Sequence, residues 1–323
     1  MAKISVIIPC YNAGQYIDRC FSSIKNQSFN DAQVIFIDDC STDATLSKLA
    51  DLQKKYPSEI VVLRNEKNSG PAVSRNKGII AATSEYTAFC DCDDWYEPDF
   101  LEKMLNTLEK NHADIVFCGY HVADEHGNQQ SRPISSVCGS LSLSEALGLE
   151  ADSLCMLMVK SSIMKETLLP DIRNGEDAAV VPLLTVRSQR HAVLSECLYN
   201  YFRRQGSASQ KPDMRVVDSL VASFEYTKIN FPKERIVELE YIGMKNVLYA
   251  AVISLFDFSY DTKKANEIIS DFEKDFPHWI DNPYFSKLNR YKQVVLKLEH
   301  FRCYFMIRLI ALFRKWLVNS SIG

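Results

Sequence analysis

The side chains best suited to chemistry lie in one short run, Cys90-Asp91-Cys92-Asp93-Asp94-Trp95. Three carboxylates occupy four positions directly after the apolar, strand-like residues 86–89. Like charges this close repel one another, and a divalent cation, or a polyphosphate carried by one, neutralises them. The run therefore predicts a metal site. The alternative is that Asp93 or Asp94 only caps a helix that opens near residue 98.

The elements that must position this run are short strands alternating with helices over the first 118 residues. Apolar β-rich runs predict strands at 4–9, 33–38, 60–63, 86–90 and 115–118. Helical periodicity predicts helices at 14–27, 43–56, 71–82 and 99–111. Ser41 and Thr42 are expected to cap the second helix, before Asp43. This order predicts an α/β fold with a mostly parallel, doubly wound sheet flanked by helices.

Polar clusters follow each of the first four predicted strands, at 10–12, 38–39, 65–70 and 91–94. In sheets of this kind, ligands bind outside the carboxyl ends of the strands, where loops of neighbouring strands meet. We therefore expect the four clusters to share one ligand-binding edge.

The rest of the chain changes character twice. Residues 119–210 predict a mixed continuation of the sheet, with an apolar run at 155–159 and a helix at 178–186 opened by residues 174–177. From about residue 211 the pattern is helical. We therefore expect a domain at 1–210, with halves 1–118 and 119–210, and a helical region at 211–323.

Composition restricts the function classes. The 323 residues are 46% hydrophobic, and the net charge of −4 carries no global signature of nucleic-acid binding. Ten scattered cysteines, several in apolar runs, favour a reducing cytoplasm over a disulfide framework, and the lone pair Cys90 and Cys92 does not predict structural zinc. The apolar N-terminal run is short and interrupted by Pro9, so we expect no export signal, and no uninterrupted apolar run predicts a membrane span.

Five motifs occur in a characteristic order. They are Val-Ile-Ile-Pro-Cys-Tyr-Asn at 6–12, Ile-Asp-Asp-Cys-Ser-Thr-Asp at 37–43, Asn-Ser-Gly-Pro-Ala-Val-Ser-Arg-Asn at 68–76, Asp-Cys-Asp-Asp-Trp at 91–95 and Gly-Glu-Asp at 175–177. Together they resemble the family 2 glycosyltransferases, which are nucleotide-sugar enzymes of the GT-A fold. The resemblance covers about residues 1–210 and implies that fold, with a helical C-terminal extension.

The resemblance implies a site for a nucleotide-sugar and a metal. Asp93, and with it Asp91, corresponds to the metal-binding D-x-D, and hard oxygen ligands beside phosphate favour Mg²⁺ or Mn²⁺. Pro9 and Tyr11 would lie against the base, and Asp39, with Asp38 nearby, would accept its imide N–H. An aspartate acceptor suits uracil or thymine, so UDP is expected. The alternative for Asp38 and Asp39 is turn formation at the strand end.

Other matched positions are assigned to the donor in the same way. Asn12, Asn68, Gly70 and Cys92 belong to the motifs that line the nucleotide-sugar, and the Cys92 side chain is expected to point away from the metal. Arg75 would reach the diphosphate from a helix that opens at Gly70 and Pro71; the alternative is a solvated arginine on the helix surface.

A second arginine is expected to close over the diphosphate. Arg203, or alternatively Arg204, lies in a segment that resembles the closing segment of related enzymes. The alternative is a plain surface pair.

The same resemblance implies the catalytic base. Inverting transfer needs one carboxylate to deprotonate the acceptor hydroxyl, and Asp177 fills that role, with Glu176 as a positioning residue. The alternative for both is the start of a helix. Small residues follow Asp177 where relatives often carry larger ones, so the acceptor is left open.

The C-terminal pattern, from Phe285 to Trp316, combines cations with large apolar residues around a single acid, Glu299. Read as a basic amphipathic helix over 285–318, it favours contact with an anionic membrane surface or helix-mediated homo-oligomerisation, and we leave these two open. A third alternative is packing on the catalytic domain. Relatives that use lipid-linked acceptors would make a peripheral position on the cytoplasmic membrane face reasonable.

The sequence therefore predicts a metal-dependent inverting glycosyltransferase that moves a sugar from a nucleotide-sugar to a growing, lipid-linked surface glycan. The first alternative is a catalytically silent scaffold that binds nucleotide-sugar. The second is a nucleotidyltransferase, against which the missing Gly-rich phosphate loop argues.

Overall fold

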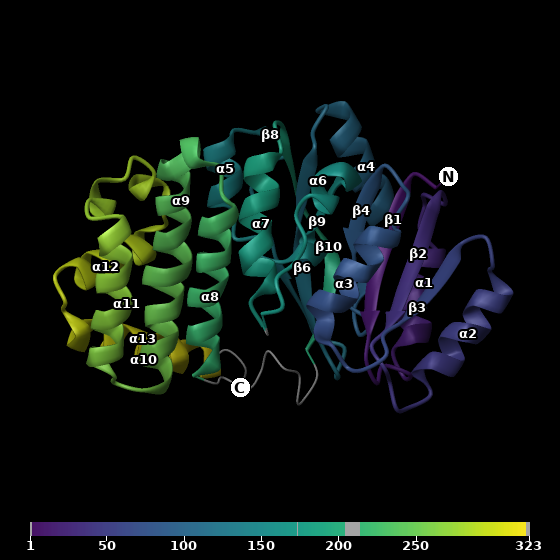
Figure 1. Cartoon of the computed structure of the whole chain (residues 1–323), viewed down its shortest axis with the longest axis horizontal. Helices are drawn as coiled ribbons and strands as arrows, with labels where there is room; N and C mark the ends of the chain where they lie inside the picture. The colour runs from purple at the N-terminus through teal and green to yellow at the C-terminus, as the bar shows by residue number, and fades with distance from the viewer. Residues whose placement is uncertain (1, 173, 204–213, 321–323) are drawn as a thin grey trace. The chain divides into compact units, whose positions relative to one another are not determined.

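The computed structural model describes residues 2–172, 174–203 and 214–320, with side chains described as far as Arg314 (Figure 1). The chain divides into two compact units, residues 1–207 and 208–323. The boundary predicted at 210 lies close to this division.

One mixed sheet forms the centre of the first unit, and it contains ten strands among the described residues. The strands are β1 (Ile4–Cys10), β2 (Ala32–Asp38), β3 (Ile60–Arg64), β4 (Tyr86–Phe89), β5 (Trp95–Tyr96), β6 (Ile115–Asp124), β7 (Gln129–Arg132), β8 (Gly139–Leu141), β9 (Leu157–Lys160) and β10 (His191–Arg203). Their order is β3-β2-β1-β4-β9-β6-β10-β5, with β7 paired to β6 and β8 paired to β10.

The first half of the sheet is parallel, as predicted. β1 pairs in parallel with β2 and β4, and β2 pairs in parallel with β3. β9 then runs antiparallel between β4 and β6, and β10 returns parallel to β6. The apolar strand residues are buried on both faces, as expected where helices cover a sheet on both sides. Because β1 to β4 point the same way, the polar clusters that follow them meet at one edge, which we call the carboxyl edge.

The helices of the first unit are α1 (Ile17–Lys25), α2 (Thr45–Lys55), α3 (Gly70–Ala81), α4 (Phe100–Lys110), α5 (Leu143–Gly148), α6 (Ser161–Lys165) and α7 (Glu176–Arg187). α1 to α4 and α7 agree with the predicted spans to within about three residues, whereas the sequence patterns do not predict α5 and α6. α3 opens with Pro71 in its first turn, as predicted. Gly78 brings this helix against the sheet, because a Cβ there would lie 2.6 Å from the Ile7 side chain. This close approach sets how α3 presents its other side chains.

The capping expected for α2 is wrong, and the capping weighed as an alternative for Asp94 at α4 is also not observed. α2 begins at Thr45 and has no side-chain cap, because Ser41 instead accepts a hydrogen bond from the Asn12 N–H and Thr42 donates its N–H to the Asn12 side chain. α4 also has no side-chain cap, and Asp94 bonds to β10 rather than to that helix. In both cases a long-range contact replaces the local cap.

The second unit is helical, as predicted. Its α-helices are α8 (Arg215–Asn230), α9 (Ile236–Gly243), α10 (Val252–Phe258), α11 (Thr262–Asp275), α12 (Arg290–His300) and α13 (Tyr304–Ser320), and a π-helical stretch, Met244–Ala251, joins α9 to α10. The segment predicted as one helix over 285–318 is two, because the chain turns at 301–303, where Arg302 has a φ of 56°.

One helical stretch of this unit, Lys233–Phe258, is long and apolar enough to cross a membrane by length and composition. Charged residues such as Lys245 interrupt this stretch, so the sequence contains no uninterrupted apolar run there. Since 78% of its most apolar window is buried, the stretch has the character of a core helix.

Candidate active site

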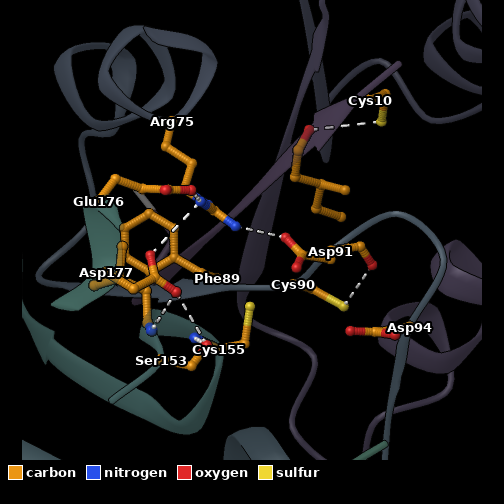
Figure 2. Close-up of polar contacts among 12 residues, drawn as sticks. Cys10, Arg75, Phe89, Cys90, Asp91, Asp94, Ser153, Cys155, Glu176 and Asp177 are labelled. Carbon is orange, nitrogen blue, oxygen red and sulfur yellow. Dashed lines mark hydrogen bonds and ion pairs between the residues drawn. The ribbon is translucent and has the colours of Figure 1, made fainter. Parts of the chain in front are cut away.

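A buried arginine lies at the centre of the carboxyl edge. Arg75, from α3, is 4% exposed and donates from Nη2 to Asp91 Oδ1 and from Nη1 to Glu176 Oε1, each at 2.8 Å (Figure 2). Asp177 Oδ1 lies 3.6 Å from the same Nη1. One guanidinium therefore joins the loop after β4 to the start of α7, and Glu176 lies 101 residues from Arg75 in the sequence. Arg75 is therefore part of a buried charge cluster and is not a solvated arginine on the helix surface.

Only one oxygen of the Asp177 carboxylate accepts hydrogen bonds from the described residues. Its Oδ2 accepts hydrogen bonds from the Ser153 hydroxyl at 3.1 Å and the Leu154 N–H at 3.3 Å, while Oδ1 has no hydrogen-bond partner among the described residues. Burial raises the pKa of Asp177 to about 6, with Arg75 opposing and Glu176 and Asp91 adding to the shift. A carboxylate with a pKa near neutrality is suited to proton transfer.

The carboxylates of the 91–94 run have three different environments. Asp91 is 38% exposed and paired with Arg75, and Asp93 is partly exposed. Asp94 is 1% exposed and accepts hydrogen bonds from the Tyr199 hydroxyl and from the Phe202 N–H, the latter at 2.7 Å. Burial raises the pKa of Asp94, and Asp91 and Asp93 raise it further. Asp94 therefore fastens the loop to β10, whereas Asp91 and Asp93 are partly exposed.

Arg19 fixes the same loop from the other side, and the sequence patterns did not single it out. Its guanidinium lies over the Trp95 and Phe202 rings, 4.1 and 4.3 Å from their centres, and donates to the Asp93 carbonyl oxygen at 2.5 Å. Beside it opens a cavity of about 560 Å³, lined also by Glu97, Asp124 and Gln129. We call the Arg19 contacts with Asp93, Trp95 and Phe202 the Arg19 bridge.

Thiols lie on both sides of Asp91. Cys90 is fully buried, with its sulfur 3.8 Å from that of Cys20 on α1. Cys92 interacts with the side chain of the buried Cys10, at the end of β1. Burial raises the pKa of Cys10 and Cys90, so these thiols act as small packing groups under the loop. The Cys92 side chain thus faces Cys10 at the end of β1.

The loops after β1 and β2 are bonded to each other. Besides the contacts of Asn12, Ala13 donates its N–H to Thr45 and Gly14 donates its N–H to Asp43. Tyr11 remains 47% exposed at the tip, and Pro9 is partly exposed at the end of β1. The predicted base-binding side chains therefore lie on a cross-linked support.

Asp38 and Asp39 have separate roles at the end of β2. Asp38 is fully buried, and its Oδ1 accepts the Ser41 N–H at 3.3 Å, as in the turn weighed from the sequence. Asp39 holds the loop before α3: its Oδ1 accepts from Asn65 and Ser69, and its Oδ2 accepts the Gly70 N–H at 2.7 Å. Asn68 is exposed on this loop.

Comparison with known proteins decides the family. The model of glycosyl transferase family 2 matches residues 5–167, which is half of the chain. The chain belongs to glycosyl transferase family 2. Among its relatives, this glycosyltransferase is 33% identical over 198 residues to TuaG of Bacillus subtilis, whose name assigns it to teichuronic acid biosynthesis; the match covers 61% of this chain and 78% of TuaG.

Solved structures confirm the GT-A fold predicted for this family 2 glycosyltransferase. The structure of S. aureus TarS 1–349 with UDP superposes with a TM-score of 0.69 at 18% identity, covering 97% of this chain and 91% of that one. TarS has also been solved with UDP-GlcNAc. The mannosyltransferase PcManGT of Pyrobaculum calidifontis, solved with GDP-Man and Mn²⁺, gives a TM-score of 0.56 at 14% identity, covering 96% and 86% of the two chains.

The donor set of this glycosyltransferase suits a metal that arrives with phosphate. Among the described residues, no group of three or more His, Cys, Asp or Glu side chains is arranged to hold an ion. Asp91 and Asp93 provide two partly exposed carboxylates in the loop after β4. Mg²⁺ in proteins is commonly bound by one or two carboxylates together with substrate phosphates. The residues present therefore fit a metal completed by a diphosphate.

The remaining predicted phosphate ligand lies at the end of β10. Arg203 is exposed and pairs in register with Asp124 of β6. Arg204, the alternative, lies outside the described residues. The structure thus brings Arg75, Asp91, Glu176 and Asp177 into one cluster. Arg203, at the end of β10, makes no contact with that cluster among the described residues.

Proposed function

We propose that this glycosyltransferase moves one sugar from UDP to a hydroxyl of a growing surface glycan, by metal-assisted single displacement with inversion. The observation that carries the proposal is the Arg75 cluster. It joins Asp91, which we assign to the side of the departing diphosphate, to Asp177, which we assign to the side of the attacking hydroxyl. A single displacement needs these two functions on opposite sides of one sugar carbon.

The metal is assigned to Asp93, with Asp91 beside it, and Mn²⁺ or Mg²⁺ suits these oxygen ligands. When bound, the ion would stabilise the charge that develops on the departing diphosphate. Asp94 and the Arg19 bridge hold the backbone of the loop, so the two ligands do not have to be ordered when the donor binds. The presence of Mn²⁺ with GDP-Man in PcManGT supports this assignment.

The base is assigned to Asp177. Ser153 and Leu154 orient its Oδ2, whereas Oδ1 is buried, 3.6 Å from Arg75 Nη1, without a hydrogen-bond partner among the described residues. Glu176 keeps Arg75 in place and is therefore a positioning residue. The side chain of Asp177 is 22% exposed, which is enough for contact with a bound acceptor.

The donor is assigned to UDP. Tyr11 offers an exposed ring for the base, and Asp39 Oδ2 accepts one hydrogen bond, from Gly70, which leaves capacity for an imide N–H. Asn12, Asn68 and Cys92 are assigned to the support around the nucleotide, and Arg203 to the diphosphate. TarS binds UDP and UDP-GlcNAc, which supports the choice of nucleotide. The name of TuaG, which refers to teichuronic acid biosynthesis, supports a surface glycan as the product. We assign the acceptor to a lipid-linked glycan at the cytoplasmic face.

Calorimetry with UDP, GDP, dTDP and CMP, each with and without Mn²⁺, tests the donor and the metal. We expect UDP to bind most tightly, to require Mn²⁺, and to lose that requirement and most of its affinity in Asp93→Ala. Asp177→Asn should keep UDP affinity within a few-fold and lose transfer by about a thousandfold or more. The matched control is Asp99→Asn, an acid outside the cluster.

Three outcomes would contradict parts of the proposal. Near-normal transfer in Asp177→Asn would exclude Asp177 as the base. Tightest binding of GDP would exclude UDP as the donor nucleotide. Absence of binding to all four nucleotides would favour a scaffold without donor chemistry.

A further inference from the structure

The outer face of α13 exposes large apolar side chains. Five large apolar residues of this helix are between 43% and 64% exposed: Phe305, Met306, Leu309, Leu312 and Phe313. At about 100° per residue their positions fall within an arc of about 120°, so they form one stripe rather than scattered contacts. Phe301, directly before the helix, is 72% exposed. Single exposed apolar residues are ordinary, but a contiguous stripe of this kind marks an interaction site.

The opposite face of α13 is anchored in the second unit. Ile307 and Ala311 are fully buried there. Arg308 donates to the Phe256 carbonyl oxygen at the end of α10, and Arg314 pairs with Asp257. The helix therefore has a defined inner face, and its outer stripe is a fixed feature of the folded unit.

The segment that precedes the stripe carries exposed cations. Lys287, Arg290 and Lys297 are exposed on and before α12. Between residues 285 and 314 the single acid is Glu299, and it is fully buried. The surface that this segment presents to solvent therefore combines apolar bulk with cations and contributes no exposed carboxylate.

We propose that this face, formed by the α13 stripe with Phe301 and the cations of α12, docks on the interface of an anionic lipid bilayer. Aromatic and aliphatic side chains of such a helix enter the boundary between headgroups and acyl chains, and neighbouring cations meet the lipid phosphates. A second copy of the chain fits less well, because a symmetric contact would bring two sets of Arg290 and Lys297 together. The inference is independent of the donor and metal assignments.

Vesicle flotation of the full chain tests the proposal. We expect the chain to float with phosphatidylcholine vesicles that contain phosphatidylglycerol, and to float weakly with phosphatidylcholine alone. Added salt should weaken the first interaction, because the cations contribute through screened charges.

Two sets of variants separate the apolar and the charged contributions. Phe305→Ser combined with Leu309→Ser should lower vesicle binding by about tenfold or more. Arg290→Glu combined with Lys297→Glu should remove the preference for phosphatidylglycerol. The matched controls are Ile229→Ser, at a residue 79% exposed on α8, and Lys274→Glu, on α11; both should bind like the wild type.

Three results would overturn the proposal. The first is a wild-type chain that floats with neither vesicle, and the second is wild-type vesicle binding by Phe305→Ser with Leu309→Ser. The third is a dimer in solution that the same double variant dissociates, which would make the face a contact between copies. Thermal unfolding and UDP binding are measured on each variant, so that loss of folding or of donor binding is distinguished from loss of docking.

Discussion

The carboxyl edge of the sheet buries charge, whereas the outer face of α13 exposes apolar surface. At the edge, Arg75 is 4% exposed and its single positive charge is surrounded by three carboxylates from two other elements. On α13, side chains such as Phe305 are more than half exposed. Both arrangements cost free energy in an isolated chain, and proteins tolerate such departures mainly where a ligand or surface is bound.

The two regions also differ in how they arise. The Arg75 cluster joins residues up to 102 positions apart, from Arg75 to Asp177, and exists only in the folded sheet. The α13 stripe arises from the spacing of residues within three helical turns. The comparison teaches that a buried charge cluster depends on tertiary structure, whereas the spacing of an apolar stripe follows from local periodicity and only its exposure depends on the fold.

Removing the central cation should have the largest effect. In Arg75→Met, three carboxylates lose their shared partner, so we expect transfer to fall by about a hundredfold or more and stability by about 3–5 kcal/mol. Urea unfolding and turnover measure the two effects. Arg75→Lys, which keeps the charge and loses the two-sided hydrogen bonding, should fall between wild type and Arg75→Met. Wild-type stability in Arg75→Met would show that Arg75 does not stabilise the three carboxylates around it.

The pH profile should report the raised pKa of Asp177. Because the base must be ionised, kcat/KM should fall about tenfold per pH unit below about 6. The native state holds the extra proton between the ordinary value of 3.8 and about 6, so the contribution of this carboxyl to stability falls as pH rises through that range. The profile is measured at fixed UDP-sugar and Mn²⁺, with Asp177→Glu for comparison. An acid limb that stays near pH 4 would contradict the assignment.

Loosening the Arg19 bridge should have a smaller effect, confined to the metal. Arg19→Ala frees the Asp93 carbonyl oxygen, and we expect Mn²⁺ binding in the presence of UDP to weaken by about tenfold. Calorimetry measures this directly. Lys25→Ala, on the same helix and paired with Glu59, is the control and should leave Mn²⁺ binding unchanged. An equal loss in both variants would indicate a general weakening of α1.

Substitution on the exposed stripe should have the smallest effect on the folded chain. Phe305→Ser with Leu309→Ser should change the free energy of unfolding by no more than about 0.5 kcal/mol per site, since these side chains lie largely in solvent. Ile307→Ser, on the buried face of the same helix, should cost several times more. Similar costs for the two faces would contradict the distinction between an inner and an outer face.

Much of the first unit could be predicted because its signals are local. The predicted spans of β1 to β4 and α1 to α4 agree with the structure to within about three residues, since strand and helix periodicities are properties of short windows. The family motifs placed the site on one edge for the same reason: they follow parallel strands.

The errors have a common cause. Ser41 was expected to cap α2 but accepts from Asn12, 29 residues away. The sequence patterns do not predict the thirteen-residue strand β10, which carries Tyr199 and Phe202 to the loop at 91–94. Its residues have no regular alternation of apolar and polar side chains, and its partner β6 lies far away in the sequence. Arg19 was missed because its three partners come from distant segments.

The sequence by itself determined the family, the order of the first strands and helices, the motif residues and the amphipathic character of the C-terminal segment. These are properties of composition and spacing over short windows. Only the tertiary structure decided that Arg75 joins Asp91 to Glu176, that Asp94 fastens its loop to β10, and that the C-terminal segment is two helices with one exposed stripe. Each depends on which distant groups are desolvated together, and burial, hydrogen bonding and charge pairing across long sequence separations arise only in the folded chain.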